Sequence, residues 1–248
     1  MTTKEVFQKQ GHYCFRWRSY LPLILLPLLL FSLPNAEVIK THFGKASGEF
    51  WKWGCVFISC LGFLIRCLVI GYAPGGTSGR NAKQQRADRL NQTGIYSLVR
   101  NPLYLGNFLM ILGVALFTET FWFIIITIVV FTLFYERIIL VEEEFLQHKF
   151  GEVFINWAQK TPAFIPKFHG WIQPDLSFSF KNVLKREYSG LLMTTLLFIG
   201  IDFLSDHFFE HRNQERFLWL ITLIVSFTIY LILRTLKKKT LLLHKTGR

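Results

Sequence analysis

A polar turn ahead of an apolar stretch holds the first residues that could bind a ligand. Arg100 and Asn101 precede Pro102, which opens a long apolar run. Proline favours the first position of a helix, where backbone N–H groups are unpaired and the helix dipole is positive. An arginine beside such an end is a ready site for an anion. Arg100 could equally be an anchor at a membrane surface, and the residues alone leave both interpretations open.

An acidic cluster follows the next apolar run. Glu142, Glu143 and Glu144 are consecutive. Ionisable groups at the end of a membrane helix are costly unless they are paired or solvated. Three adjacent carboxylates also repel one another, so we expect them to have partners, either arginine side chains or a cationic ligand. A solvated, salt-bridged helix end is the alternative.

The sequence contains none of the common motifs of soluble enzymes. It has no G-x-G-x-x-G between a strand and a helix, no H-E-x-x-H, no G-x-S-x-G and no P-loop. The four cysteines fit no metal-ligand spacing, so we predict no metal site. A glycine-rich turn at residues 74–79 could offer backbone N–H groups to an anion, although such turns are more often only flexible.

The polar segments are separated by apolar blocks that are long enough for membrane helices. Hydrophobic residues make up 51% of the 248 residues, and there are 26 Phe, which is more than a water-soluble domain of this length carries. A helix needs about 20 apolar residues to cross the hydrocarbon core. The blocks are residues 20–33, 50–72, 103–141 (two passes), 190–204 and 217–236. We predict an all-α, polytopic bundle of about six spans, forming one domain over residues 1–248 without a Rossmann fold.

The basic residues are distributed unevenly between the connections. The net charge is +12, and Lys and Arg concentrate at both termini and in the segments 80–100 and 149–186. The connections at 117–120 and 205–216 carry no excess of them. The positive-inside rule therefore places both termini and both long basic segments in the cytoplasm. The hydropathy excludes a soluble nucleic-acid-binding protein.

Three ordered blocks of residues lie between positions 94 and 166. The first contains Gly94-Ile95-Tyr96, Arg100-Asn101-Pro102, Tyr104 and Gly106. The second contains Glu142-Glu143, Leu146, Phe150-Gly151, Phe154 and Trp157. The third is Thr161-Pro162-Ala163-Phe164-Ile165-Pro166. In this order they resemble the isoprenylcysteine carboxyl methyltransferase and phospholipid methyltransferase superfamily. Asn101 stands where that family usually has His, and Phe154 and Trp157 stand where it has Tyr.

The resemblance implies a site for S-adenosylmethionine at the cytoplasmic membrane face. The residues that would hold the methionine and adenosine parts are Tyr96, Arg100, Asn101, Pro102 and Tyr104. Glu142 and Glu143 would meet the ribose hydroxyls or the amino group. Arg100, Asn101 and Glu143 are the implied catalytic residues, and methyl transfer from a sulfonium needs positioning and water exclusion but no metal.

The family also implies a lipid acceptor, which in its branches is a prenylcysteine carboxylate, an ethanolamine phospholipid amine or a lipid A phosphate. We favour an anionic head group, with a lipid A-type phosphate first, in a bacterial inner membrane. Asn101 removes the most plausible base, and an anionic oxygen needs none. The candidate acceptor contacts are Arg66, Arg80 and Arg86, within or beside a basic segment that also contains Lys83 and Arg89.

Two other classes of function stay open at this point. An acidic cluster could bind a proton or cation in a transporter or electron-transfer protein, and the chain could be a lipid-binding scaffold without activity. Against a pump, we find no acid at mid-span, and we interpret Arg66 as the only embedded charge.

Overall fold

The computed structural model describes residues 2–35, 38–77, 85–209 and 216–243, and these form an all-α bundle. The N-terminal elements are α1 (Thr3–Trp17), η1 (Arg18–Tyr20), α2 (Leu21–Ser32), η2 (Leu33–Asn35) and α3 (Val38–Phe43). The remaining elements are α4 (Lys45–Tyr72), η3 (Ile95–Ser97), α5 (Pro102–Phe117), α6 (Phe121–Phe150), α7 (Glu152–Lys160), α8 (Phe180–Phe209) and α9 (Arg216–Lys239). The described residues form no strand, only one isolated bridge between Gly94 and Ile172.

Six apolar helices run up and down the bundle, as predicted, but fewer of them are long enough to span a membrane. Four helices are long and apolar enough to cross a membrane: Lys45–Tyr72, Phe121–Phe150, Phe180–Ser205 and Phe217–Lys239. A fifth candidate combines Thr3–Tyr20 with Leu23–Ser32, which meet at a bend of 61°. The count among the described residues is therefore four or five. The prediction of about six spans also counted α5, which has 16 residues, and took the block around α2 to need flanking residues, which α1 supplies.

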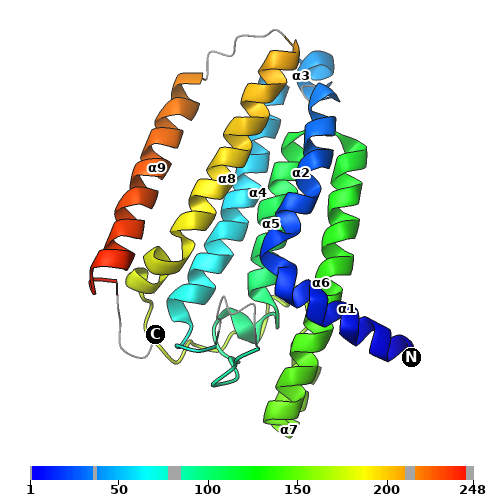
Figure 1. The fold of residues 1–248 in the computed structure, drawn as a ribbon, viewed down its shortest axis with the longest axis vertical. Coiled ribbons are helices and arrows are strands. Elements are labelled where there is room, and N and C mark those ends of the chain that lie inside the picture. Colours follow the sequence, from blue (N-terminus) through cyan, green and yellow to red (C-terminus); the bar gives the residue numbers. More distant parts are fainter. Residues whose placement is uncertain (1, 36–37, 78–84, 210–215, 244–248) are drawn as a thin grey trace.

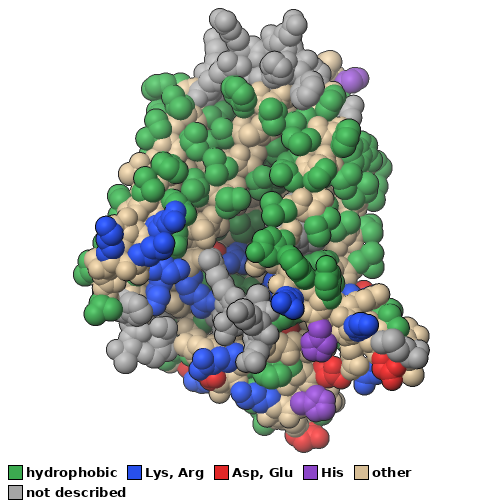
Figure 2. Space-filling model, in the orientation of Figure 1, with side chains coloured by type: hydrophobic (Ala, Val, Ile, Leu, Met, Phe, Trp, Pro, Cys, Tyr) green, Lys and Arg blue, Asp and Glu red, His purple; other side chains and the backbone are tan. Residues whose placement is uncertain are grey.

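The charged segments gather at one end of the bundle. Figure 1 shows α1, the foot of α5, α7 and the end of α9 at the lower end, while α3 and the turn between α5 and α6 lie at the upper end. In Figure 2 most Lys and Arg side chains lie in the lower half, below a broad hydrophobic surface. The exposed apolar side chains of α4, α6 and α9 are consistent with contact to lipid.

The most extensive helix contact joins α4 to α5, and small residues lie in it. A Cβ added at Gly62 would lie 2.5 Å from the carbonyl oxygen of Gly106, and one at Gly106 would lie 2.6 Å from Cγ of Arg66. Ser59 Oγ donates to the Met110 carbonyl oxygen at 2.8 Å. Small residues at a membrane helix interface allow the backbones to approach and pack. This contact fixes the position of Arg66 along the bundle axis relative to the N-terminal end of α5.

Two buried ion pairs cross the bundle, and they correct an expectation about embedded charge. Lys52 on α4 pairs with Asp202 on α8 at 2.8 Å, and Arg66 on α4 pairs with Glu187 on α8 at 2.8 Å. Both acids lie within the candidate span Phe180–Ser205. The statement that Arg66 is the only embedded charge is therefore wrong. Each of the two acids is matched by a cation on α4, which lowers the cost of burying its charge.

Reporter fusions test the topology. Fusions after Arg89 and after Lys167 should report the same side of the membrane, which we expect to be the cytoplasm, and a fusion at Thr118 should report the opposite side. The physical reason is the excess of Lys and Arg in the first two segments. Opposite reports from the Arg89 and Lys167 fusions would rule out this arrangement.

A glycine substitution tests the α4–α5 contact. Gly106→Ala should lower the free energy of unfolding by about 1–3 kcal/mol, because the added methyl overlaps α4. Gly54→Ala on α4 is the matched control, since a Cβ there meets nothing within 4 Å. The control should be neutral or slightly stabilising. Thermal unfolding in detergent measures both, and equal midpoints would contradict the close packing.

Candidate active site

The first motif block forms a turn that is held by the segment after α7. Gly94 adopts φ 63°, a conformation that favours glycine, and its N–H donates to the Ile172 carbonyl oxygen at 2.8 Å. Ser97 Oγ donates to the Gly94 carbonyl oxygen at 2.7 Å and accepts the Ile172 N–H at 3.0 Å. Backbone hydrogen bonds from Arg100 to Pro162 and from Lys167 to Leu98 extend this contact. Two segments about 70 positions apart therefore position the foot of α5.

Arg100 lies immediately before the start of α5, as predicted, but it faces α6 and α7. Its Nε is 3.1 Å from Oε1 of Glu143, and its Nη1 donates to the Ala158 carbonyl oxygen at 3.1 Å. Asn101 is the N-cap residue of α5, yet its side chain does not cap the helix and instead donates to the Ala163 carbonyl oxygen at 3.0 Å. The third motif block thus contacts the first directly.

Each acid of the cluster has its own partner, as the sequence led us to expect. Glu142 accepts the Tyr104 hydroxyl at 2.8 Å and pairs with Arg18 at 3.4 Å. Glu143 pairs with Arg100, and Glu144 accepts the Gln8 amide at 2.5 Å. The three carboxylates project from α6 toward α5, the turn before it and α1, which separates their charges.

These residues surround the mouth of a cavity of about 1000 Å³ that continues into the bundle. Of the predicted site residues, those that line it are Tyr96, Arg100, Asn101, Pro102, Tyr104, Glu142, Arg66 and Arg86. Glu143 stands behind Arg100 and does not line it. Arg80 and Lys83 lie outside the described residues.

The arginines at the cavity are already paired in the structure. Arg66 makes a bidentate contact with Glu187, which is almost fully buried, and Arg86 makes one with Asp88 at the surface. An anionic acceptor would therefore have to displace or share a carboxylate. That exchange costs less at the exposed Arg86 pair than at the buried Arg66 pair, because solvent screens the former.

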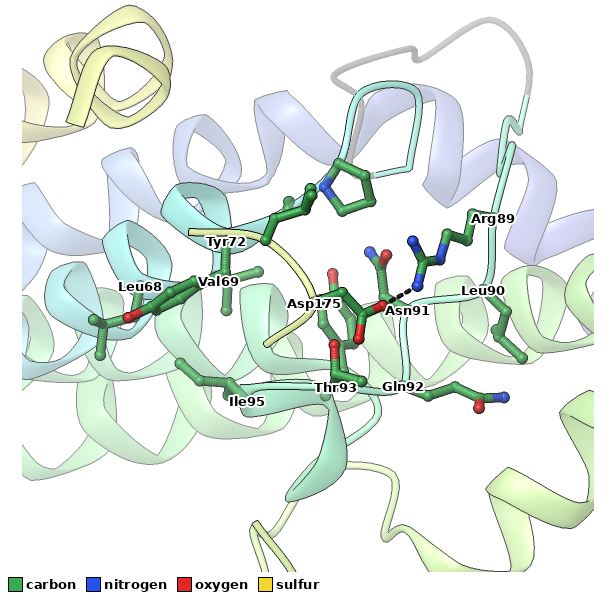
Figure 3. A pocket seen from close by; sticks show the side chains of 14 residues that line it. Leu68, Val69, Tyr72, Arg89, Leu90, Asn91, Gln92, Thr93, Ile95 and Asp175 are labelled. Atoms are coloured by element: carbon green, nitrogen blue, oxygen red, sulfur yellow. Dashed lines mark hydrogen bonds and ion pairs between the residues drawn. The ribbon is translucent and has the colours of Figure 1, made fainter. Parts of the chain in front are cut away.

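A smaller cavity of about 280 Å³ adjoins the large one beside Tyr96. Figure 3 shows Arg89 and Asp175 pointing toward each other at its edge, where they form an ion pair between the segment before η3 and the segment before α8. Burial raises the pKa of Tyr96 to about 12, so its hydroxyl stays protonated at neutral pH and can donate a hydrogen bond. Trp157 Nε1 donates to the Tyr96 carbonyl oxygen at 3.3 Å.

Sequence reasoning missed three residues at this site. Arg18 and Glu187 are each more than 120 positions from the residue that they pair with, so no local spacing reveals them. Asn107 could have been found, because it is a polar residue in an apolar helix one turn after Tyr104, and such residues face the interior of a bundle.

Comparison with known proteins identifies the segment that carries the first motif block and most of the second. Residues 54–153 match the family model of phospholipid methyltransferases, which covers most of α4 through the start of α7. The chain is 32% identical over 108 residues to protein-S-isoprenylcysteine O-methyltransferase of Schizosaccharomyces pombe. The matched segment is thus similar to the isoprenylcysteine carboxyl methyltransferase and phospholipid methyltransferase superfamily. The resemblance seen in the motif blocks is thereby confirmed for the superfamily, while the lipid A branch stays a prediction.

Two bacterial relatives are heavy-metal resistance proteins. The chain is 33% identical over 123 residues to the cobalt-zinc-cadmium resistance protein CzcN of Cupriavidus metallidurans. It is 37% identical over 83 residues to the nickel-cobalt-cadmium resistance protein NccN of Alcaligenes xylosoxydans xylosoxydans. The described residues contain no group of three or more His, Cys, Asp and Glu able to hold a metal ion.

All of these matches are partial. They cover 34%, 47% and 43% of this chain for NccN, CzcN and the yeast enzyme, and 38%, 54% and 46% of those proteins. The chain thus spans about half, or less, of the length of the curated relatives it matches. No solved structure matches the chain significantly.

Proposed function

We propose that the protein transfers a methyl group from S-adenosylmethionine to an anionic oxygen of a membrane-embedded lipid. The observation that carries this proposal is the position of the motif residues. Arg100, Tyr104 and Glu142 stand at the charged mouth of a cavity whose interior is apolar. One end suits a polar cofactor, and the other suits a lipid.

The cofactor fits the polar atoms at the mouth. Arg100 Nε and Glu143 Oε1 are buried and make no hydrogen bond, although they face each other as an ion pair. Arg100 also lines the cavity, so its guanidinium can meet a ligand's carboxylate there. Glu143 stands behind Arg100 and would hold that guanidinium in place through the ion pair.

The chain's own residues contribute positioning and charge. Arg100 would orient the cofactor's carboxylate, and Glu142, held by Tyr104 and Arg18, would accept hydrogen bonds from its hydroxyl or amino groups. When bound, S-adenosylmethionine supplies a sulfonium methyl group, so a new C–O bond forms as the C–S bond breaks and the sulfur keeps the electron pair. An anionic oxygen has no proton to lose, which is compatible with Asn101 in place of a basic residue.

For the acceptor we favour a lipid phosphate of the lipid A type. Arg86 and Arg89 line the mouth, and their ion pairs are solvent-exposed and therefore readily exchanged for a phosphate. The yeast relative, which is named as an isoprenylcysteine O-methyltransferase, favours a prenylcysteine carboxylate as the second candidate. Both acceptors present an anionic oxygen and an apolar tail.

Cofactor titration tests the first half of the proposal. Glu143→Gln and Arg100→Ala should each weaken S-adenosylmethionine binding about tenfold or more, the effect of losing a charge-assisted hydrogen bond. Isothermal titration of purified protein measures the affinity. Glu136→Gln on the same helix, whose carboxylate is largely exposed, and Arg234→Ala on α9 are matched controls that should bind normally. Normal affinity for S-adenosylmethionine in both Glu143→Gln and Arg100→Ala would show that these residues only anchor the protein at the membrane surface.

Lipid mass spectrometry tests the acceptor. Lipids from cells with the gene should contain a species heavier by one methylene unit than those from cells without it, and fragmentation should place the methyl on a phosphate oxygen. The Glu143→Gln variant should lack this species. A methyl on an amine would reject the anionic acceptor, and one on a prenylcysteine carboxylate would select the second candidate.

A further inference from the structure

The upper part of the cavity is an apolar arm enclosed by four helices. Its walls include Leu25 and Leu29 of α2, Ile111 and Ala115 of α5, Phe123 of α6 and Leu197 of α8. We call this part the apolar arm. Figure 2 shows the surface hollowed near the middle of its apolar half, with hydrophobic side chains on both sides. Space of this chemistry favours hydrocarbon over a polar cofactor.

The apolar arm is closed at its upper end. Leu29, Ala115 and Phe123 line it and also belong to a buried hydrophobic cluster. Behind them the same cluster contains Phe117 and Phe198, which pack edge to face with ring centroids 5.0 Å apart. A ligand in the arm therefore ends against a packed core, which resists deformation.

A strip of polar side chains marks the lower end of the arm. Glu187 of α8 accepts two hydrogen bonds from Arg66 of α4. Arg66 donates to Asn107 of α5 at 2.5 Å, and Asn107 donates to the Tyr135 hydroxyl of α6 at 3.2 Å. These four residues, the polar strip, cross the bundle from α8 to α6. Below these residues an alkyl chain would gain no free energy from burial, whereas a polar head group could form hydrogen bonds there.

The distance between the polar strip and the closed end sets a length. Ala115 is eight residues above Asn107 on α5, or about 12 Å along a helix. Phe123 is twelve residues above Tyr135 on α6, or about 18 Å. An extended chain advances about 1.2 Å per bond, so the arm accommodates a hydrocarbon of roughly 10 to 15 carbons.

We propose that the apolar arm binds one hydrocarbon chain of the acceptor, with the anionic head group below the polar strip, toward Arg86 and Arg89 at the mouth, and with Ala115 limiting chain length. The proposal rests on the proposed function for the identity of the ligand as the methyl acceptor. The whole cavity, about 1000 Å³, is at the upper end of the range for a single drug-sized ligand. It has room for one chain beside the cofactor, so further chains of the same lipid would lie outside, in the bilayer.

Native mass spectrometry of the purified full chain tests the arm directly. The probes are octyl, dodecyl and hexadecyl phosphate, with dodecanoate and dodecylamine to test the head group. The wild-type protein should bind one dodecyl phosphate more tightly than octyl phosphate, because each buried methylene adds affinity. Dodecyl phosphate and dodecanoate should both bind more tightly than dodecylamine.

Two opposite variants test the role of Ala115. Ala115→Phe should weaken binding of hexadecyl phosphate about tenfold, the contribution of about two buried methylenes, and leave octyl phosphate nearly unchanged. Leu29→Ala should shift the preference toward the longer chain by opening the closed end. Val129→Phe, on the exposed face of α6, is the matched control and should keep the wild-type preference.

The outcomes separate this proposal from the proposed function. Equal chain preference in the wild type, Ala115→Phe and Leu29→Ala, in proteins that bind S-adenosylmethionine normally, would overturn the apolar arm and leave methyl transfer intact. Chain preference that follows the variants in a protein that binds no S-adenosylmethionine would support the arm and overturn the proposed function. Tighter binding of the amine than of the two anionic probes would overturn the assignment of the head group.

Discussion

The close contact between α4 and α5 determines the geometry of everything below it. With glycine at positions 62 and 106 the two backbones touch, and the space left by the missing Cβ of Gly106 is filled by the side chain of Arg66. Arg66 thereby reaches both Asn107 and Glu187. The same contact sets the height of α5, and so the position of Arg100 and Asn101 at its foot. A larger side chain at this crossing would move the polar strip and the mouth of the cavity together.

Charge pairing is the second constraint. Inside a membrane an unpaired ion is expensive, and three ion pairs of this bundle join residues on different elements. Arg18 with Glu142 joins the N-terminal segment to α6, Arg66 with Glu187 joins α4 to α8, and Lys52 with Asp202 repeats that connection near the other end. The pairs specify which helices are neighbours, a task that apolar side chains facing lipid cannot perform because the lipid is equally apolar.

The sequence predicted those features that depend on local pattern. The apolar helices, the position of Arg100 just before α5 and the need of three adjacent acids for partners all follow from composition and spacing. The identity of the partners did not follow, because Arg18 and Glu142 are 124 positions apart and only the fold brings them together. The block at residues 190–204 is also shorter than α8, because the polar residues before it, Glu187 among them, lower the hydropathy of the first turns of that helix. The predicted count of about six spans exceeds the four or five candidates among the described residues, because α5 has only 16 residues and α2 completes a span only together with α1.

The boundaries of the family match have a consequence for how such a protein can change. The matched segment, residues 54–153, supplies Arg100, Asn101, Tyr104, Glu142 and Glu143, whereas α2 and α8 lie outside it. Two walls of the apolar arm and the carboxylate that holds Arg66 therefore come from helices that the family model does not include. A shared core can in this way acquire a new acceptor by exchanging the helices that surround it, without altering the residues at the mouth.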